Sequence, residues 1–205
     1  MDRRRLICRV AGAAALAASG GFLVACSDAK SKVQFHSVDV TGASYAKNFD
    51  LTDFNGKERT LADYKGDVVA VFFGYTHCPD VCPTTLAELA QVRKKLGSQS
   101  DKFQVLFVSL DPERDTPTVL KSYLGAFDKS FVGLYTPSIS DLPKLAKSFK
   151  IFYQKVDGKA SDGYSVDHSA ATFIYDPQGR LRLYSPNDNS VANMTSDVKL
   201  LLKGA

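Results

Sequence analysis

The chain has few of the residues that cross-link a protein through disulfides or metal ions, and its sequence is not repetitive. It has only four cysteines and three histidines among 205 residues, and it contains no internal repeat and no low-complexity segment. Its 44% hydrophobic content is that of an ordinary globular chain. Without residues 1–25, a chain of this length buries roughly 70% of the surface that it exposes when unfolded. A disulfide framework is therefore unnecessary, and the cysteines are available for chemistry.

The chain also lacks a strong excess of charge outside its first residues. The formal net charge is +4. Most of the excess lies in residues 1–25, where four arginines stand against one aspartate. The remainder is almost neutral and has no basic stripe, which argues against nucleic acid as the main partner.

No apolar run is long enough for a convincing membrane span. Met1 to Arg9 is basic, and Val10 to Ala25 is uncharged and rich in alanine and glycine. This pattern is typical of a secretory signal. It ends in Leu23-Val24-Ala25-Cys26, which resembles the bacterial lipoprotein box, in which the cysteine is lipidated and becomes the new N-terminus. The alternatives are an uncleaved anchor and an ordinary cleavage site that leaves Cys26 free.

The leader predicts three parts of the chain. Residues 1–25 are the lipoprotein signal peptide, residues 26–45 are a polar flexible tether, and residues 46–205 form the domain. The expected location is the bacterial cell envelope, with the domain lipid-anchored on the extracytoplasmic, periplasmic side. Disulfides are permitted in that compartment.

Strand and helix patterns alternate along the domain. This order predicts an α/β fold, a thioredoxin-like sandwich with a central β-sheet flanked by helices. The expected elements are a hairpin over Phe49–Leu61, a strand over Asp67–Phe73, a helix over Pro83–Leu96, a strand over Phe103–Leu110, a helix over Thr118–Phe127, a strand over Phe131–Leu134, a helix over Asp141–Phe149, an extended segment over Ile151–Val156, a hairpin over Ala171–Tyr184 and a helix over Val191–Leu202.

Two cysteines follow the first central strand, at the edge of the sheet where α/β proteins bind ligands. Pro83 suits the first turn of a helix, so Cys82 is expected at the N-cap, where the helix dipole favours a thiolate. Cys78 and Cys82 are separated by three residues. Thioredoxin-type oxidoreductases use two, so the wider spacing favours a chelating pair over an exchange catalyst.

One of the three histidines is expected to complete a metal site. His36 falls in the predicted tether and is interpreted as solvated. His77 adjoins a cysteine, and neighbouring side chains in an extended loop point apart. His168 precedes the strand Ala171–Tyr175, and in a thioredoxin-like domain the loop at that place packs against the cysteine loop. His168 is therefore the predicted third ligand.

Two thiolates and one imidazole suit copper. Thiolates favour Cu(I), and a nitrogen donor keeps Cu(II) tolerable. A structural zinc site normally has four protein ligands, so zinc would have to recruit Asp80 or His77. The sequence thus predicts copper, as Cu(I), Cu(II) or both, on Cys78, Cys82 and His168, with Asp167 orienting the loop.

Three separated blocks of sequence carry a family resemblance. Phe72–Leu86 (FFGYTHCPDVCPTTL), Ser109–Pro117 (SLDPERDTP) and Val166–Pro177 (VDHSAATFIYDP) are similar to the Sco/SenC family of copper metallochaperones, and the resemblance extends from about Phe49 to the C-terminus. It implies copper binding by the cysteines and the histidine, and a role in assembling the dinuclear copper site of cytochrome c oxidase or a related haem-copper oxidase. The implied partners are the copper-receiving oxidase subunit and an envelope donor of copper or electrons. The lipoprotein box replaces the membrane helix of many relatives.

Three functions are compatible with a cysteine pair on this fold. A non-enzymatic carrier passes copper by ligand exchange, whereas a thiol-disulfide reductase cycles Cys78 and Cys82 through a redox disulfide. Some Sco/SenC members act mainly as such reductants of the receiving subunit. A peroxidase of the peroxiredoxin type is disfavoured, since nothing between the cysteines requires its polar pocket.

The segment Asp111–Pro117 follows the second central strand, on the same edge as the cysteine loop. Two interpretations remain open. Its charges contact a partner or shape the rim of the site, or it is a capped loop with Asp115 and Thr116 near the N-cap of the next helix.

Overall fold

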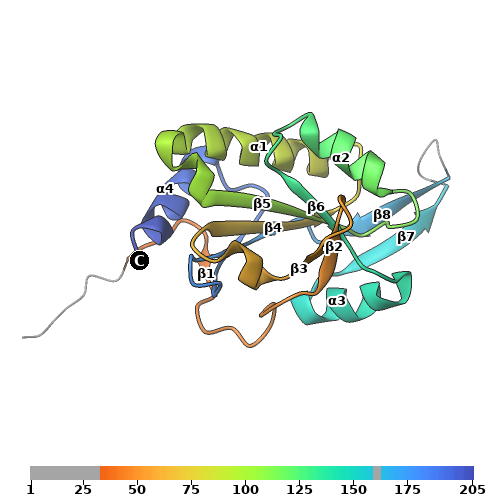
Figure 1. The fold of residues 1–205 in the computed structure, drawn as a ribbon, viewed down its shortest axis with the longest axis horizontal. Coiled ribbons are helices and arrows are strands. Elements are labelled where there is room, and N and C mark those ends of the chain that lie inside the picture. The colour runs from red at the N-terminus through yellow and green to blue at the C-terminus, as the bar shows by residue number, and fades with distance from the viewer. Residues whose placement is uncertain (1–32, 159–162) are drawn as a thin grey trace, which may run out of the picture. The chain divides into compact units, whose positions relative to one another are not determined.

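A computed structural model of the chain describes residues 33–158 and 163–205, and this part has the predicted α/β architecture (Figure 1). One eight-stranded sheet has the order β1-β10-β9-β4-β5-β6-β2-β3, and β7 and β8 form a separate pair. The strands are β1 (Val38–Asp39), β2 (Leu51–Asp53), β3 (Glu58–Arg59), β4 (Val68–Gly74), β5 (Phe103–Ser109), β6 (Val132–Tyr135), β7 (Tyr153–Asp157), β8 (Tyr164–His168), β9 (Thr172–Tyr175) and β10 (Leu181–Ser185). The helices are α1 (Val81–Leu96), α2 (Pro117–Gly125), α3 (Leu142–Phe149) and α4 (Val191–Leu202), with short 3-10 turns at Leu61–Tyr64, Gly97–Lys102 and Ile139–Asp141.

The middle of the sheet is parallel. β4 pairs with β5 and β5 with β6 in parallel, while β9 runs antiparallel on the other side of β4. Every residue of β4 is buried, which explains why its sequence is a continuous apolar run rather than an alternating one. In Figure 1, α1 and α2 lie on one side of the sheet and α3 lies on the other.

Two neighbouring phenylalanines of β4 pack on opposite faces of the sheet. The ring of Phe72 packs against Phe107, with ring centroids 6.1 Å apart. The ring of Phe73 packs against Phe149 of α3 at 4.9 Å. Because side chains alternate along a strand, Gly74 lies on the same face as Phe72, toward α1.

The N-terminal part of the described chain is packed on the domain, and the expectation of a tether is wrong for Val33–Tyr45. The backbone N–H groups of His36 and Ser37 donate to the carboxylate of Asp197 at 2.9 and 2.8 Å. β1 then pairs with β10. The backbone of the segment makes these contacts, so its polar composition gives no sign of them. The imidazole of His36 is exposed, as expected.

Residues 1–32 lie outside the described residues, and with them Cys26 and the predicted signal peptide. In the part that the structure describes, no helix has both the length and the hydropathy of a membrane span.

Two local predictions next to the site are also corrected. Helix α1 begins at Val81 with Asp80 at its N-cap, so Cys82 is the second helical residue and not the cap. Proline is tolerated throughout a first helical turn, because the N–H groups there have no intrahelical acceptor. His168 ends the strand β8 and does not lie in a loop. The hairpin was missed because its strands, YQKVD and YSVDH, are largely polar.

Candidate metal centre

The cysteine loop joins the end of β4 to the start of α1. Cys78 lies in this loop and is half-buried, while Cys82 is buried in the first turn of α1. Both are free thiols. Asp115 holds the loop through Thr76. Its carboxylate accepts hydrogen bonds from the backbone N–H of Thr76 at 3.1 Å and from the hydroxyl of Thr76 at 2.6 Å.

His168 approaches the cysteines from the β7–β8 hairpin. Its Nδ1 lies 2.9 Å from the carbonyl oxygen of Ser169, and its Nε2 lies 3.4 Å from Sγ of Cys82. A carbonyl only accepts, so Nδ1 donates to it, and Nε2 is the ring nitrogen that faces the sulfur. The carbonyl of Ser169 thus orients the ring. Asp167 is exposed and lines the cleft beside His168, and its role in orienting the loop stays a prediction.

The donor atoms of Cys78, Cys82 and His168 all lie within 4.8 Å of one another. Two atoms bound to one ion at about 2.0–2.3 Å are at most about 4.6 Å apart, so shifts of a few tenths of an ångström bring all three onto one ion. The sulfur of Cys78 and the imidazole face an open cleft of about 460 Å³ between the cysteine loop and β8. The set has the ligands and the access that a soft metal ion requires.

The two thiols differ in acidity. The pKa of Cys78 is lowered, first because Cys82 donates a hydrogen bond to it, and also because His168 and backbone N–H groups at the start of α1 face it. The pKa of Cys82 is raised, because its thiol is held by Cys78 and is buried. The hydrogen bond from Cys82, with a smaller contribution from the backbone N–H groups at the start of α1, therefore favours the thiolate on Cys78, and the expectation of a thiolate on Cys82 is wrong.

Alkylation should distinguish these thiols in the reduced, metal-free chain. Cys78 is expected to react with iodoacetamide well before Cys82, and its reaction should persist as the pH falls from 8 to 5, because a lowered pKa preserves the nucleophilic thiolate there. Peptide mass spectrometry at timed intervals measures both sites. Equal rates, or a Cys78 rate that disappears below about pH 8 like that of an ordinary thiol, would contradict this assignment.

Gly74 is a residue of the site that the sequence analysis did not single out. A Cβ at this position would lie 2.7 Å from Sγ of Cys82 and 2.9 Å from the ring of Phe107. Glycine at the end of β4 therefore makes the space in which the buried sulfur lies. A glycine inside a strand pattern, directly before the cysteine loop, was the available signal.

Substitution of Gly74 by alanine is expected to displace the sulfur of Cys82. We expect a loss of about 1–3 kcal/mol in unfolding free energy from overpacking, together with weaker metal binding. Gly125→Ala is the matched control, because a Cβ there meets nothing within 4 Å. Denaturant titration and metal competition measure both effects, and equal behaviour of the two variants would refute the packing role.

The remaining candidates lie outside the ligand cluster. The side chains of His77 and Asp80 are exposed, and neither belongs to a metal-ligand cluster in the described residues. In the segment Asp111–Pro117, Thr116 caps α2 by accepting from the N–H of Val119, as one interpretation expects. Asp115 is buried beneath the cysteine loop instead.

The fold and the site together define a class: thioredoxin-like domains in which two thiols, one in a strand–helix loop and one in the first turn of the helix, meet an imidazole from a distant strand. A model of the SCO1/SenC family matches residues 38–203, and the chain therefore belongs to the SCO1/SenC family. The resemblance predicted from the three sequence blocks is confirmed.

Individual relatives agree. The mitochondrial protein SCO2 of Saccharomyces cerevisiae is 40% identical over 134 residues, 64% of this chain and 44% of that protein. A SCO2-like protein of Rickettsia felis is 37% identical over 134 residues, 65% of each chain. The chain thus spans less than two thirds of the length of these relatives.

Solved structures match over nearly their whole length. The structure of Bradyrhizobium japonicum ScoI with copper bound has a TM-score of 0.68 and 39% identity, covering 75% of this chain and 97% of that one. A SCO1/SenC family lipoprotein from Bacillus anthracis has a TM-score of 0.64 and 26% identity, covering 75% and 92%. These matches confirm the thioredoxin-like fold.

Proposed function

We propose that the chain is a copper metallochaperone that binds one copper ion through Cys78, Cys82 and His168. The observation that carries this proposal is the convergence of the three donor atoms within 4.8 Å at an open cleft. The copper bound in the B. japonicum relative supports the choice of metal.

The donor set favours copper over zinc. Two thiolates and an imidazole provide three ligands, which suits Cu(I) and tolerates Cu(II). A structural zinc site needs four, and no fourth histidine, cysteine or carboxylate joins this cluster in residues 33–158 and 163–205. Metal analysis of the reduced chain after incubation with equal copper and zinc should find one copper per chain. Binding of zinc alone would redirect the proposal.

The recipient we propose is the copper-receiving subunit of a respiratory haem-copper oxidase. An open cleft supports transfer by ligand exchange, because a thiolate of the recipient can reach the ion before a ligand of the donor leaves. Cys82 is buried and Cys78 is half-buried and lines the cleft, so Cys78 is the sulfur that a recipient can approach. The donor that loads the chain belongs to the same compartment.

Cys26 is the proposed site of lipidation, and the domain would lie on the extracytoplasmic side of the membrane. The sequence Leu23-Val24-Ala25-Cys26 and the lipoprotein relative from B. anthracis support this location. A Cys26→Ser chain is expected to leave the membrane fraction on cell fractionation. Retention of that variant in the membrane would overturn the lipid anchor.

A second function, thiol-disulfide reduction, is favoured by the unequal acidities of the two thiols. The thiolate of Cys78 would attack a disulfide of the target and form a mixed disulfide, with one target sulfur leaving as a thiolate. Cys82 would then attack the Cys78 sulfur, after losing its proton. The target is released with two reduced thiols, and the chain retains a Cys78–Cys82 disulfide. This step would prepare the thiols of the same recipient.

Complementation tests the proposed function. In cells that lack this chain, the copper content and activity of the oxidase should fall, and the wild-type chain should restore both. His168→Ala separates the two roles, since reduction needs only the sulfurs. Failure of His168→Ala to restore copper supports delivery, whereas full restoration by His168→Ala would leave reduction as the function.

A further inference from the structure

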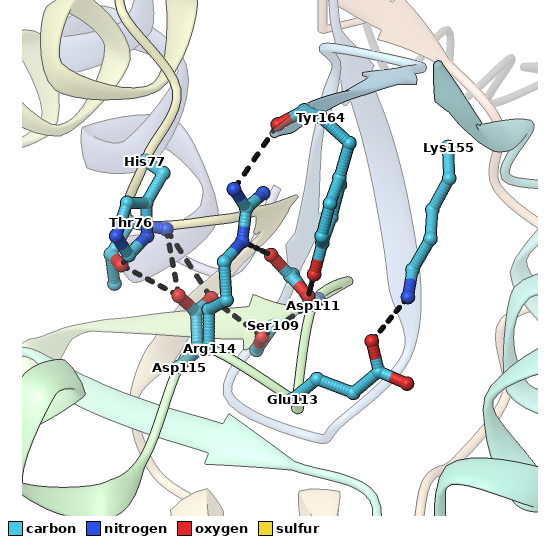
Figure 2. A network of polar contacts seen from close by, with 9 residues as sticks. All are labelled: Thr76, His77, Ser109, Asp111, Glu113, Arg114, Asp115, Lys155 and Tyr164. Atoms are coloured by element: carbon cyan, nitrogen blue, oxygen red, sulfur yellow. Dashed lines mark hydrogen bonds and ion pairs between the residues drawn. The ribbon is translucent and has the colours of Figure 1, made fainter. Parts of the chain in front are cut away.

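The segment Asp111–Asp115 contacts both halves of the candidate metal centre. Figure 2 shows it between the cysteine loop, represented by Thr76, and the β7–β8 hairpin, represented by Tyr164 and Lys155. The fold gives this position to the segment, because it follows β5, whose parallel neighbour β4 leads into the cysteine loop. The sequence interpretations of the segment were a capped loop, or charges that contact a partner or shape the rim of the site, and neither specifies a bridge between the two halves.

On the hairpin side, Arg114 is the central contact. Its Nε donates to the carboxylate of Asp111, and its Nη1 donates to the carbonyl oxygen of Tyr164 at 3.1 Å. The guanidinium also lies over the ring of Tyr164, 3.7 Å from the centroid. The hydroxyl of Tyr164 donates to Asp111 at 2.7 Å. Asp111 is fully buried, so it gives the partly exposed Arg114 and Tyr164 an anchor in the interior.

These contacts act on the strand that carries the imidazole. Tyr164 and His168 are the first and last residues of β8, and with an even separation they face the same side. β7 and β8 pair only with each other and are not hydrogen-bonded into the main sheet. Isolated two-stranded hairpins are at best marginally stable, so the orientation of this one depends on side-chain anchors.

A second path leads from the same guanidinium to the imidazole. Arg114 lies 5.8 Å from the ring centroid of Tyr75, and the ring of Tyr75 packs edge-on against His168 at 6.0 Å. Arg114 therefore contacts both the far end of β8 and an aromatic ring that borders the ligand.

We infer that Arg114 is a positioning residue for His168: held by Asp111, it fixes Tyr164 and with it the hairpin, so that the imidazole is placed beside the two sulfurs before metal arrives. This inference rests on the proposed copper function. It assigns to the segment Asp111–Asp115 the preorganisation of the copper site. Asp115, which holds Thr76 on the cysteine side, completes the bridge.

The test is a double-mutant cycle on the full chain, with Arg114→Gln, His168→Ala and the double variant. Cu(II) competition titration should show Kd raised about tenfold or more by Arg114→Gln, the effect typical of groups that orient a metal ligand. In the His168→Ala background, Arg114→Gln should change Kd by less than about twofold, because the residue through which it acts is gone. The visible spectrum of copper-loaded Arg114→Gln should shift toward that of His168→Ala.

Arg182→Gln is the matched control. Arg182 also pairs with a buried aspartate, Asp176, and its side chain is 11% exposed against 15% for Arg114. Loss of this arginine should leave Kd unchanged in both backgrounds. If Arg114→Gln does not fold, judged by thermal unfolding, Tyr164→Phe replaces it. That variant removes only the hydroxyl bond to Asp111 and should raise Kd about threefold, again only when His168 is present.

The outcomes separate this inference from the proposed function. Equal effects of Arg114→Gln in both backgrounds would mean that it acts on the thiols or on folding, and would overturn the positioning role. No effect on Kd in the presence of His168 would overturn it as well. If His168→Ala itself leaves Kd unchanged, the proposed ligand set is wrong, and the inference falls with it.

Discussion

Cys82→Ser is expected to raise the Kd for copper by about 1000-fold, or ~4 kcal/mol. The sulfur of Cys82 is buried beside Gly74 and directly faces Nε2 of His168. A serine hydroxyl fits the same space but remains protonated and is a hard donor, so a soft ion loses one of its two thiolates. The same variant should be unable to form the intramolecular disulfide, so it loses both proposed functions.

A control separates the sulfur from its surroundings. Val81→Ser introduces the same hydroxyl one residue earlier, in the first turn of α1, and should keep Kd within a few-fold of wild type. Competition titration with a copper chelator measures both variants. Comparable losses in the two would show that a perturbed helix start, rather than a missing thiolate, weakens binding.

His168→Ala should raise the Kd for Cu(II) by about 100-fold, or ~2.7 kcal/mol, while leaving disulfide exchange by the cysteine pair intact. The imidazole supplies the one nitrogen donor of the cluster. Cu(II) binds nitrogen donors well, whereas thiolates alone favour Cu(I). Exchange needs only the sulfurs. Stopped-flow reduction of a small disulfide measures this second activity.

His77→Ala is the corresponding control. His77 is next to Cys78 in sequence, yet its side chain is exposed and lies outside the ligand cluster. We expect its copper affinity to stay within about twofold of wild type. An effect of His77→Ala as large as that of His168→Ala would mean that the wrong histidine has been assigned.

The central fold could be predicted because its signals are local and strong. The apolar runs that became β4 and β5 lie within one residue of their predicted ends, and the helix after the cysteines ends at Leu96 as expected. The family could also be predicted from the sequence, because three blocks of residues in the same order resemble it. The long-range approach of His168 to Cys82 rested on the order of elements, and the structure does bring the two side chains together.

The features that could not be predicted from the sequence all depend on tertiary contacts. β8 and β1 are polar segments whose pairing partners lie far away or across a turn, so periodicity does not reveal them. The expectation of a thiolate on Cys82 was wrong, because the pKa of this thiol depends on its hydrogen bond with Cys78 and on its burial. The glycine before the cysteine loop was a sequence signal of close approach, but only the structure shows that the sulfur of Cys82 is the atom that lies 2.7 Å from a Cβ at Gly74.

X-ray absorption at the copper edge of the loaded full chain is the most direct test of the site. The central claim is that two sulfurs and one imidazole nitrogen share a single ion. We predict two sulfur neighbours and one imidazole per copper in the wild-type chain, and two sulfurs without the imidazole in His168→Ala. A wild-type spectrum with no imidazole, or with fewer than two sulfurs, would contradict the claim.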